Sequence, residues 1–241
     1  MKQASWKGFD AFLKTVLEME IPEGGVALFR GQPVSAPLLP KLVRSSPLTD
    51  VAPVERRMLR HLRNRSTLLL GGSTYTDLQL LALAQHHGMA TRLLDWSSNP
   101  LVALWFACAE PHSSKSGHIY VYRVYPENIE TPTSLVDPFS LSMTRVFKPD
   151  FASDRIDAQQ GWFSIHPCMG GAFGYKAACE DPIHFLSIFH LEIPAPEKLS
   201  ILEALEKMGI SADKLFPGLD GLCRQTNWAF IAELPGLEKR L

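Results

Sequence analysis

The chain has 241 residues, of which 46% are hydrophobic and 20% charged, and its formal net charge is −1. This length fits one ordinary domain, and the composition is that of a folded globular protein rather than a disordered chain. A net charge this close to zero provides no overall field that would attract nucleic acid or an acidic membrane. The longest apolar stretches, such as residues 101–109, are too short to cross a bilayer, and the first ten residues lack the apolar core of a signal peptide.

The cysteines are Cys108, Cys168, Cys179 and Cys223, and they show no CxxC pairing. Without a secretory signal, such cysteines are expected to be reduced thiols. We therefore expect a cytoplasmic protein without a membrane partner.

In the first half of the chain, helical and strand-like patterns alternate. Apolar spacing, turn residues and capping residues mark each element. In chain order they predict a helix over 5–20 with Ser5 as N-cap, a strand over 26–32, an ordered loop over 33–50, and a helix from Pro53 to about Arg65. There follow a helix over about 76–87 that stops at Gly88, a strand over 91–96, a helix that begins at Pro100 with Ser98 or Asn99 as cap, and a strand over 117–124.

The second half is less regular. It predicts a loop over 126–140, a short helical or turn segment over 154–160, a strand over 161–165, a glycine-rich segment over 166–182, a strand over 183–194, an amphipathic helix over 196–208 and a last helical piece. No linker or internal repeat divides the chain. Strands and helices joined by both short and long connections predict a single α+β domain over 1–241.

Arg30 is the first candidate for chemistry, because it lies between Phe29 and Gly31 in an apolar strand. A buried arginine must be paired, and its planar fork of donors suits a carboxylate or a phosphate. A structural salt bridge and a ligand clamp explain the pattern equally well. Gly31 favours the clamp slightly, since a residue without a side chain lets another group approach the backbone.

The segment QHHGMATRLLDWSSNP (85–100) gathers polar and aromatic residues at a predicted strand–turn–helix junction. Such groupings are typical of ligand pockets, and the free amides at the start of the following helix suit an anion. Two adjacent histidines face different directions on a helix and lack metal-ligand spacing, so no metal site is predicted and one of them is equally well a cap. From the residues alone, Asp95 is more simply an anchor for Arg92 or Thr91 than a catalytic group.

Two further patterns have both a functional and a structural explanation. Arg155 and Gln159 are four residues apart and would share a helical face before a strand, either at the mouth of a site or on a surface turn. RRMLRHLRNR (56–65) carries Arg56, Arg60 and Arg63 near one helical face, and such a stripe can grip nucleic-acid phosphates. A solvated stripe over a buried apolar side is the more common arrangement.

Several motifs resemble the FRG domain family, and they occur in that family's order. They are FRGQ (29–32), LLPKLVR (38–44), Glu55, LALAQHHGMATRLLDWSSNPLVALWFA (81–107), RIDAQQGWF (155–163) and LFPGLDGL (215–222). The middle block is long and specific. The resemblance covers most of the core 26–165 and continues more weakly into a helical extension over 195–241.

A more remote resemblance is to the ADP-ribosyltransferases, which implies a split mixed or antiparallel sheet flanked by helices, with NAD as cofactor. In those enzymes one strand carries an arginine or histidine that binds NAD, a second carries a Ser/Thr motif before a helix, and a third presents a catalytic glutamate. FRG at 29–31 and LLDWSSNPLVALWFA at 93–107 are similar to the first two elements, and QQGWFSI at 159–165 takes the place of the third. The resemblance then implies that Arg30 orients NAD and that Trp96 and Ser97 lie beside the nicotinamide.

On this alignment Gln159 or Gln160 stands where the glutamate is expected, and a neutral amide cannot stabilise an oxocarbenium-like ribose as an anion does. Either Asp95, Glu180 or Glu192 takes that role, or the domain binds a nucleotide without turning it over. The predicted catalytic residues are Arg30, Asp95 and Gln160. The predicted NAD contacts are Arg30, Gly31, Gln85, His86, His87, Thr91, Arg92, Trp96, Ser97, Asn99, Arg155 and Gln159.

Two hypotheses of different class follow. The first is an NAD-dependent ADP-ribosyltransferase or NAD-cleaving effector, of the toxin or phage-defence type that the FRG resemblance suggests. The second is a non-catalytic nucleotide- or partner-binding module. A nucleic-acid target rests on the basic helix alone. The acceptor, any activating protein and the oligomeric state are left open by the sequence.

Overall fold

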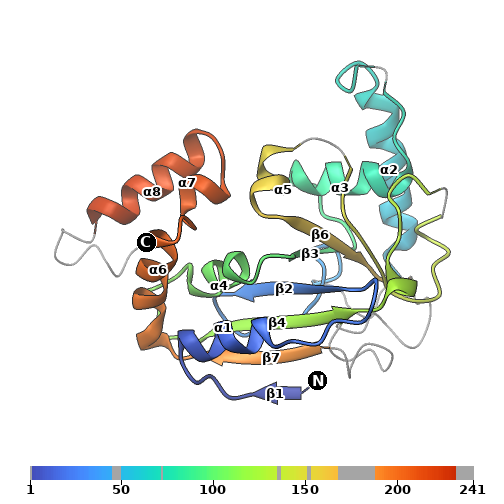
Figure 1. Cartoon of the computed structure of the whole chain (residues 1–241). Coiled ribbons are helices and arrows are strands. Elements are labelled where there is room, and N and C mark those ends of the chain that lie inside the picture. Colours follow the sequence, from blue (N-terminus) through green and yellow to red (C-terminus); the bar gives the residue numbers. More distant parts are fainter. Residues whose placement is uncertain are drawn as a thin grey trace.

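The computed structural model describes residues 2–44, 50–71, 73–134, 137–150, 153–167 and 188–231 (Figure 1). In this part of the chain seven strands form one sheet with the order β1-β7-β4-β2-β3-β6-β5. The strands are β1 (Lys2–Ala4), β2 (Val26–Gln32), β3 (Leu93–Ser97), β4 (Gly117–Val124), β5 (Arg145–Phe147), β6 (Gly161–Ile165) and β7 (Ile188–Ile193). Neighbouring strands run antiparallel except β1 and β7, which are parallel. The predicted α+β fold with a mixed sheet is confirmed.

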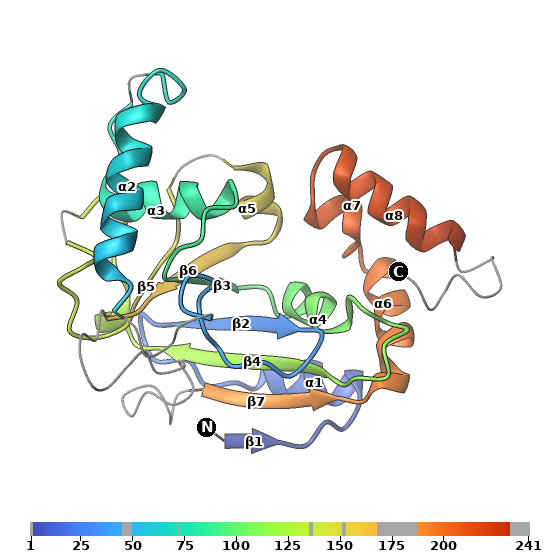
Figure 2. The same ribbon diagram turned by 180° about the vertical axis from the view of Figure 1, so that it is seen from behind.

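The described helices pack on one face of this sheet. They are α1 (Phe9–Leu17), α2 (Ala52–Ser66), α3 (Asp77–His86), α4 (Pro100–Cys108), α5 (Asp154–Ala158), α6 (Lys198–Lys207), α7 (Ala212–Leu215) and α8 (Leu219–Ile231), with 3-10 turns at Pro126–Asn128 and Ala195–Glu197. In Figure 1, α2, α3 and α5 gather over β3 and β6, while α1, α4 and α6 lie by β2, β4 and β7. Seen from behind in Figure 2, the segment after β2 crosses the opposite face.

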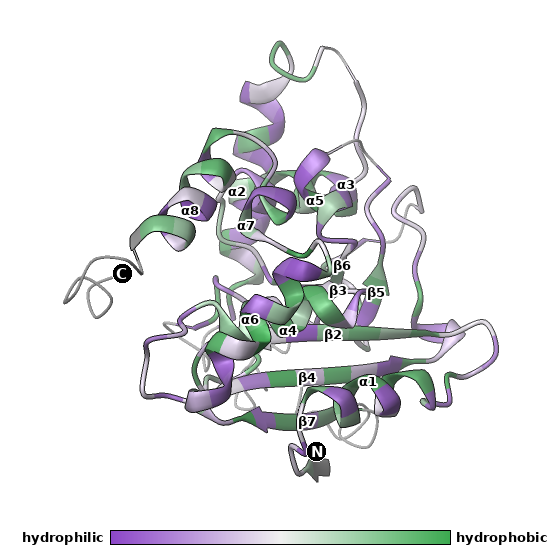
Figure 3. Cartoon of the chain, turned by 60° about the vertical axis from the view of Figure 1, so that its left-hand side comes forward, coloured by the Kyte–Doolittle hydropathy of each residue, from purple (hydrophilic) through white to green (hydrophobic). Residues whose placement is uncertain are grey.

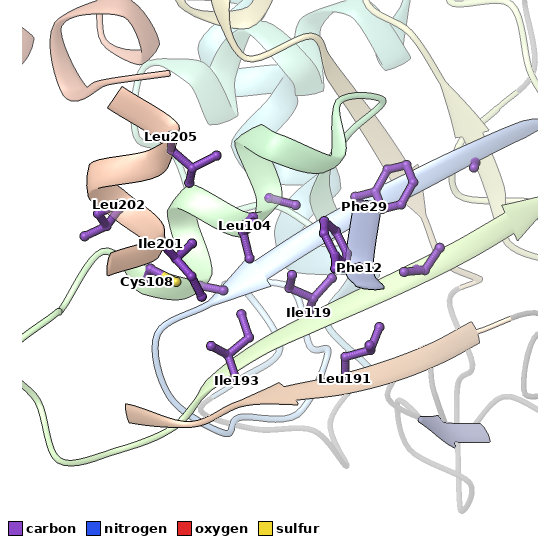
Figure 4. Close-up of a cluster of buried hydrophobic side chains, with 14 residues drawn as sticks. Phe12, Phe29, Leu104, Cys108, Ile119, Leu191, Ile193, Ile201, Leu202 and Leu205 are labelled. Atoms are coloured by element: carbon purple, nitrogen blue, oxygen red, sulfur yellow. The ribbon is translucent and has the colours of Figure 1, made fainter. Parts of the chain in front are cut away.

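The main hydrophobic core lies between α1, α4, α6 and the central strands. Figure 4 shows Phe29, Ile119 and Leu191 from three neighbouring strands facing Leu104 of α4, with Ile201 of α6 beside them. These side chains are almost fully withdrawn from solvent. Figure 3 shows the corresponding hydrophobic colour along the central strands and on α4. Burial of this apolar surface fixes α4 across β2.

Local signals account for the helix ends next to the site. Thr76 caps α3 with a capping box, since its hydroxyl accepts from Gln79 N and the Gln79 side chain accepts from Thr76 N. Gly88 stops the same helix at φ 93°, a conformation that suits glycine. Asn99 caps α4 by accepting from Leu101 N at 2.9 Å, with Pro100 at the first position. These ends agree with the sequence-based prediction.

The N-terminal helix is shorter than predicted, and Ser5 is not its cap. Residues 2–4 form β1, which pairs with β7, and Gly8 at φ 96° precedes the first helical turn. The chain leaves β1 at Ala4, and residues 5–8 are neither strand nor helix, so the helix begins only at Phe9. The strand predicted over 91–96 instead begins at Leu93 and ends at Ser97.

Other differences lie in the second half. β5 was not predicted, because three residues carry too little periodicity to mark a strand. The strand predicted over 183–194 is seen as β7, and its first residues, like most of the glycine-rich segment 166–182, lie outside the described residues. In the described part of the chain, no helix combines the length and apolar character needed to span a membrane.

Candidate functional site

A pocket opens where β2 and β3 separate. The two strands pair at Phe29 and Ser97 and then diverge, and β3 continues by pairing with β6. The cavity has a volume of about 380 Å³, within the range of small-molecule sites. Its walls come from β2, the segment after β2, α3, β3, α4, α5 and β6. The separation of β2 from β3 therefore creates a concave surface around Arg30.

Gly31 permits this arrangement by letting α4 lie directly on β2. A side-chain carbon at Gly31 would lie 1.8 Å from the carbonyl oxygen of Ala103. The sequence predicted close approach at this glycine, and the approaching group is the helix backbone rather than a ligand. The backbone of Gly31 still forms part of the pocket wall.

Arg30 extends across the fork with one donor unused. Its Nη1 donates to the backbone carbonyl of Asp95 at 2.7 Å and lies 3.7 Å from the Asp95 carboxylate. Its Nε is buried and has no hydrogen-bond partner among the described residues. Burial lowers the pKa of the guanidinium, an effect that the Asp95 charge opposes and the Arg44 charge reinforces. A cation largely withdrawn from solvent, with a buried donor to spare, is suited to receive an anion.

Asp95 is the carboxylate of the pocket. Of the described residues that line the cavity, no other is acidic. Its Oδ1 accepts from Gln85 Nε2 at 2.6 Å, so an amide from α3 orients it, and the side chain is 63% exposed. Of the two other candidates, Glu192 lies on β7 outside the lining, and Glu180 lies outside the described residues.

The pocket is strongly cationic. Lys41 and Arg44 from the segment after β2, and Arg155 from α5, join Arg30 in its walls. Four cations against one carboxylate favour a ligand with several negative charges. Sequence reasoning missed Lys41 and Arg44, although both lie in the quoted motif LLPKLVR, because nothing local indicates that this segment folds back onto β2.

Aromatic side chains complete the walls. Phe106 of α4 and Trp162 of β6 are partly exposed and line the cavity, and neither was predicted. His86 also lines it, and its pKa is lowered by burial and by the nearby His87 and Arg155, which favours the neutral ring. Flat apolar faces beside cations are suited to a heterocyclic base.

The side chains of Trp96 and Ser97 lie on opposite faces of the sheet. Successive strand residues face opposite sides of a sheet, and Trp96 packs on the face opposite α4. Its indole N–H donates to Ser164 Oγ at 2.9 Å, and the side chain is buried. The Ser97 hydroxyl donates to the Gln159 carbonyl at 2.7 Å and accepts from Asn99 N at 3.0 Å. Both side chains border the pocket chiefly as structural supports.

Arg92 and Thr91 were predicted ligand contacts, but the structure places both outside the pocket lining. Arg92 is fully buried and donates to the Glu55 carboxylate from its backbone N (2.6 Å) and Nε (2.5 Å). Its two remaining terminal nitrogens donate to the carbonyls of His166 (2.7 Å) and Pro138 (3.1 Å). Thr91 donates to the Gln85 side chain. Arg92 thus ties α2 to β3, and Thr91 supports the amide that holds Asp95.

Of the remaining predicted site residues, some line the pocket and others do not. Gln159 lines the pocket, whereas Gln160, the second stand-in for the glutamate, is exposed and absent from the lining. Gln160 adopts φ 46°, and its carbonyl accepts from Ser98 N at 3.1 Å. His87 is exposed beyond α3 and Asn99 serves as a helix cap, so neither is brought to the pocket.

Two arginines of the basic stripe on α2 form ion pairs with described residues. Arg56 lies 3.3 Å from Asp137, and Arg63 lies 2.6 Å from Asp77. Of the three arginines expected near one face, Arg60 is exposed without an ion pair among the described residues. This pairing reduces the charge available to nucleic-acid phosphates.

The family model of the FRG domain matches residues 26–116, which confirms that resemblance. The matched segment runs from β2 through α4 and holds Arg30, Lys41, Gln85 and Asp95. Comparison with curated proteins and with solved structures found no significant match.

Proposed function

Starting from the FRG domain at residues 26–116, we propose that this protein binds NAD in the pocket at the β2–β3 fork and cleaves it. It would act as an NAD glycohydrolase or an ADP-ribosyltransferase, in an effector of the toxin or phage-defence type. The observation that carries the proposal is Arg30, a guanidinium 14% exposed whose buried Nε is unused, facing one carboxylate in a cationic pocket.

The charge pattern suits a dinucleotide. The diphosphate of NAD carries two negative charges, and Arg30, Lys41, Arg44 and Arg155 supply cations around the cavity. The partly exposed rings of Phe106 and Trp162 offer faces for the nicotinamide or the adenine. A small neutral ligand would make no use of four cationic side chains.

The proposed chemistry breaks the bond between the ribose C1′ and the nicotinamide nitrogen. The bonding electrons go to the pyridinium nitrogen, so nicotinamide leaves neutral and the ribose becomes oxocarbenium-like. The Asp95 carboxylate stabilises this positive charge, and its hydrogen bond from Gln85 at 2.6 Å keeps it in position. Water or an acceptor nucleophile then bonds to C1′ and releases its proton to solvent.

The alternative is a module that binds NAD without cleaving it. One observation favours this reading: Asp95 lies 3.7 Å from Arg30, which partly neutralises it, and it is mostly solvated. Both features weaken its effect on a developing cation. Neutral amides at positions 159 and 160 do not replace that charge.

Two substitutions separate these functions. Arg30→Ala should weaken NAD binding about 10- to 100-fold, the value of one or two hydrogen bonds to a charged group. Asp95→Asn keeps the shape and the hydrogen bond to Gln85, and should retain binding while lowering nicotinamide release about 10²- to 10³-fold. Asp157→Asn, an exposed carboxylate on α5 outside the lining, is the matched control and should change neither.

Binding is measured by calorimetry and cleavage by chromatography of released nicotinamide. Heat protection by NAD without any nicotinamide release would support the binding module instead. If Arg30→Ala left both binding and turnover unchanged, the site itself would be wrongly assigned.

A further inference from the structure

The C-terminal helices contact the mouth of the pocket, although they lie outside the matched FRG segment. Gln159 Nε2 donates to the carbonyl of Leu215, the last residue of α7, at 3.0 Å. The guanidinium of Arg155 lies over the ring of Phe216, 4.9 Å from its centre. Both Gln159 and Arg155 line the pocket. Two site residues, one on α5 and one directly after it, are therefore held by the last residue of α7 and the residue that follows it.

Phe216 is itself fixed from several sides. Its ring lies 5.9 Å from that of Trp105 and 6.0 Å from that of Phe106, both on α4. Arg224 of α8 also lies over it, 4.5 Å from the ring centre. The side chain is buried. Because Phe106 is also part of the pocket wall, the aromatic cluster Trp105, Phe106 and Phe216 connects the C-terminal helices to the site.

Arg155 needs such support. It is exposed and makes no ion pair with any described residue, so its long side chain would otherwise sample many rotamers. A guanidinium stacked on a ring keeps its N–H edge free, and that edge can bind a phosphate bidentately. The ring contact therefore orders the cation without using its donors.

We infer that α7 and α8 complete the anion-binding site, with Phe216 as the residue that positions Arg155 against a phosphate of the bound nucleotide. The carbonyl of Leu215 holds Gln159 at the same edge. This inference rests on the proposed function, whose ligand supplies the phosphate. Phe216 acts through Arg155 and contacts no substrate itself.

The test compares Phe216→Leu, Arg155→Gln and the double variant of the full chain, by calorimetry with NAD and with inorganic pyrophosphate. Arg155→Gln should weaken binding of both probes about tenfold, and Phe216→Leu about threefold. In the Arg155→Gln background, Phe216→Leu should have no further effect, because it acts through that arginine. Phe216→Tyr keeps the ring face, so this variant should bind both probes as tightly as the unaltered chain does.

Phe230→Leu is the matched control, since Phe230 is an exposed aromatic on α8. It should leave both Kd values unchanged, and melting curves of all variants report whether they fold. An equal loss from Phe216→Leu with and without Arg155 would overturn the inference, because the ring would then act through the fold alone. Binding of pyrophosphate but not NAD would contradict the proposed function. The effect of Phe216→Leu with and without Arg155→Gln would then be measured with pyrophosphate, and it would still test the role of Phe216. Binding of neither probe to the unaltered chain would overturn both.

Discussion

Replacing Glu55 by glutamine should destabilise this protein far more than breaking an ion pair on its surface. The Glu55 carboxylate is 0% exposed and the Arg92 side chain 1% exposed, and they are joined at 2.5 Å. Glutamine keeps the size and one acceptor oxygen, but it removes the charge. Arg92 would then be a buried cation whose other hydrogen bonds to described residues go to backbone carbonyls, with the Phe139 ring 5.1 Å from its guanidinium carbon.

The magnitude follows from this burial. Removing one partner of a buried ion pair costs about 3–5 kcal/mol, a large part of the roughly 5–15 kcal/mol that stabilises a typical domain. Asp137→Asn is the matched control, because Asp137 pairs with Arg56 at 3.3 Å with both side chains nearly half exposed. Breaking such a pair costs at most about 1 kcal/mol.

Urea unfolding followed by circular dichroism gives both free energies of unfolding. A third variant, Glu55→Leu with Arg92→Met, should recover much of the loss, since an apolar pair leaves no unpaired charge. If Glu55→Gln cost no more than Asp137→Asn, the Glu55–Arg92 pair would not be what ties α2 to β3.

Three further outcomes are expected. Gly31→Ala should lower the melting temperature strongly or prevent folding, because the added carbon would overlap a carbonyl of α4; an unchanged melting curve would show that α4 does not lie on β2 as described. Burial lowers the pKa of both His118 and His190 below the ordinary 6.5, so the unfolded chain binds more protons and the free energy of unfolding should fall as the pH drops from about 7 to about 5. Replacing both by phenylalanine should flatten that dependence in urea titrations, and an unaltered slope would contradict it. Burial also raises the pKa of the Cys108 thiol to about 12, so iodoacetamide at about pH 8 should label the exposed Cys223 and spare Cys108 in peptide mapping; equal labelling would show that Cys108 is accessible.

Much of the candidate site could be found from the sequence, because its motifs are local. Arg30, Gln85 and Asp95 lie in the motifs that point to a ligand, and all three line the pocket. Arg92 belongs to the same block, yet its burial depends on Glu55, which is 37 residues earlier in the chain. The sequence motifs include both residues, but they do not indicate that the two side chains form an ion pair.

The local elements follow from the order of the amino acids alone. The strands at 26–32, 117–124 and 161–165 agree residue for residue with their predicted bounds, because a run of apolar or alternating side chains reports which backbone is buried. The start of α4 at Pro100 was also predicted, with Ser98 or Asn99 as its cap, because a helix start depends on only a few neighbouring residues.

Which residues face the pocket depends instead on contacts between segments that are distant in the chain. Divergence of β2 from β3 opens the cavity, and the course of the chain after β2 brings Lys41 and Arg44 to Arg30. Strand alternation turns Trp96 away from Asp95, and α7 reaches back to α5 from the far end of the chain. These placements depend on strand order and on burial of apolar faces between segments distant in sequence, and no local pattern encodes either.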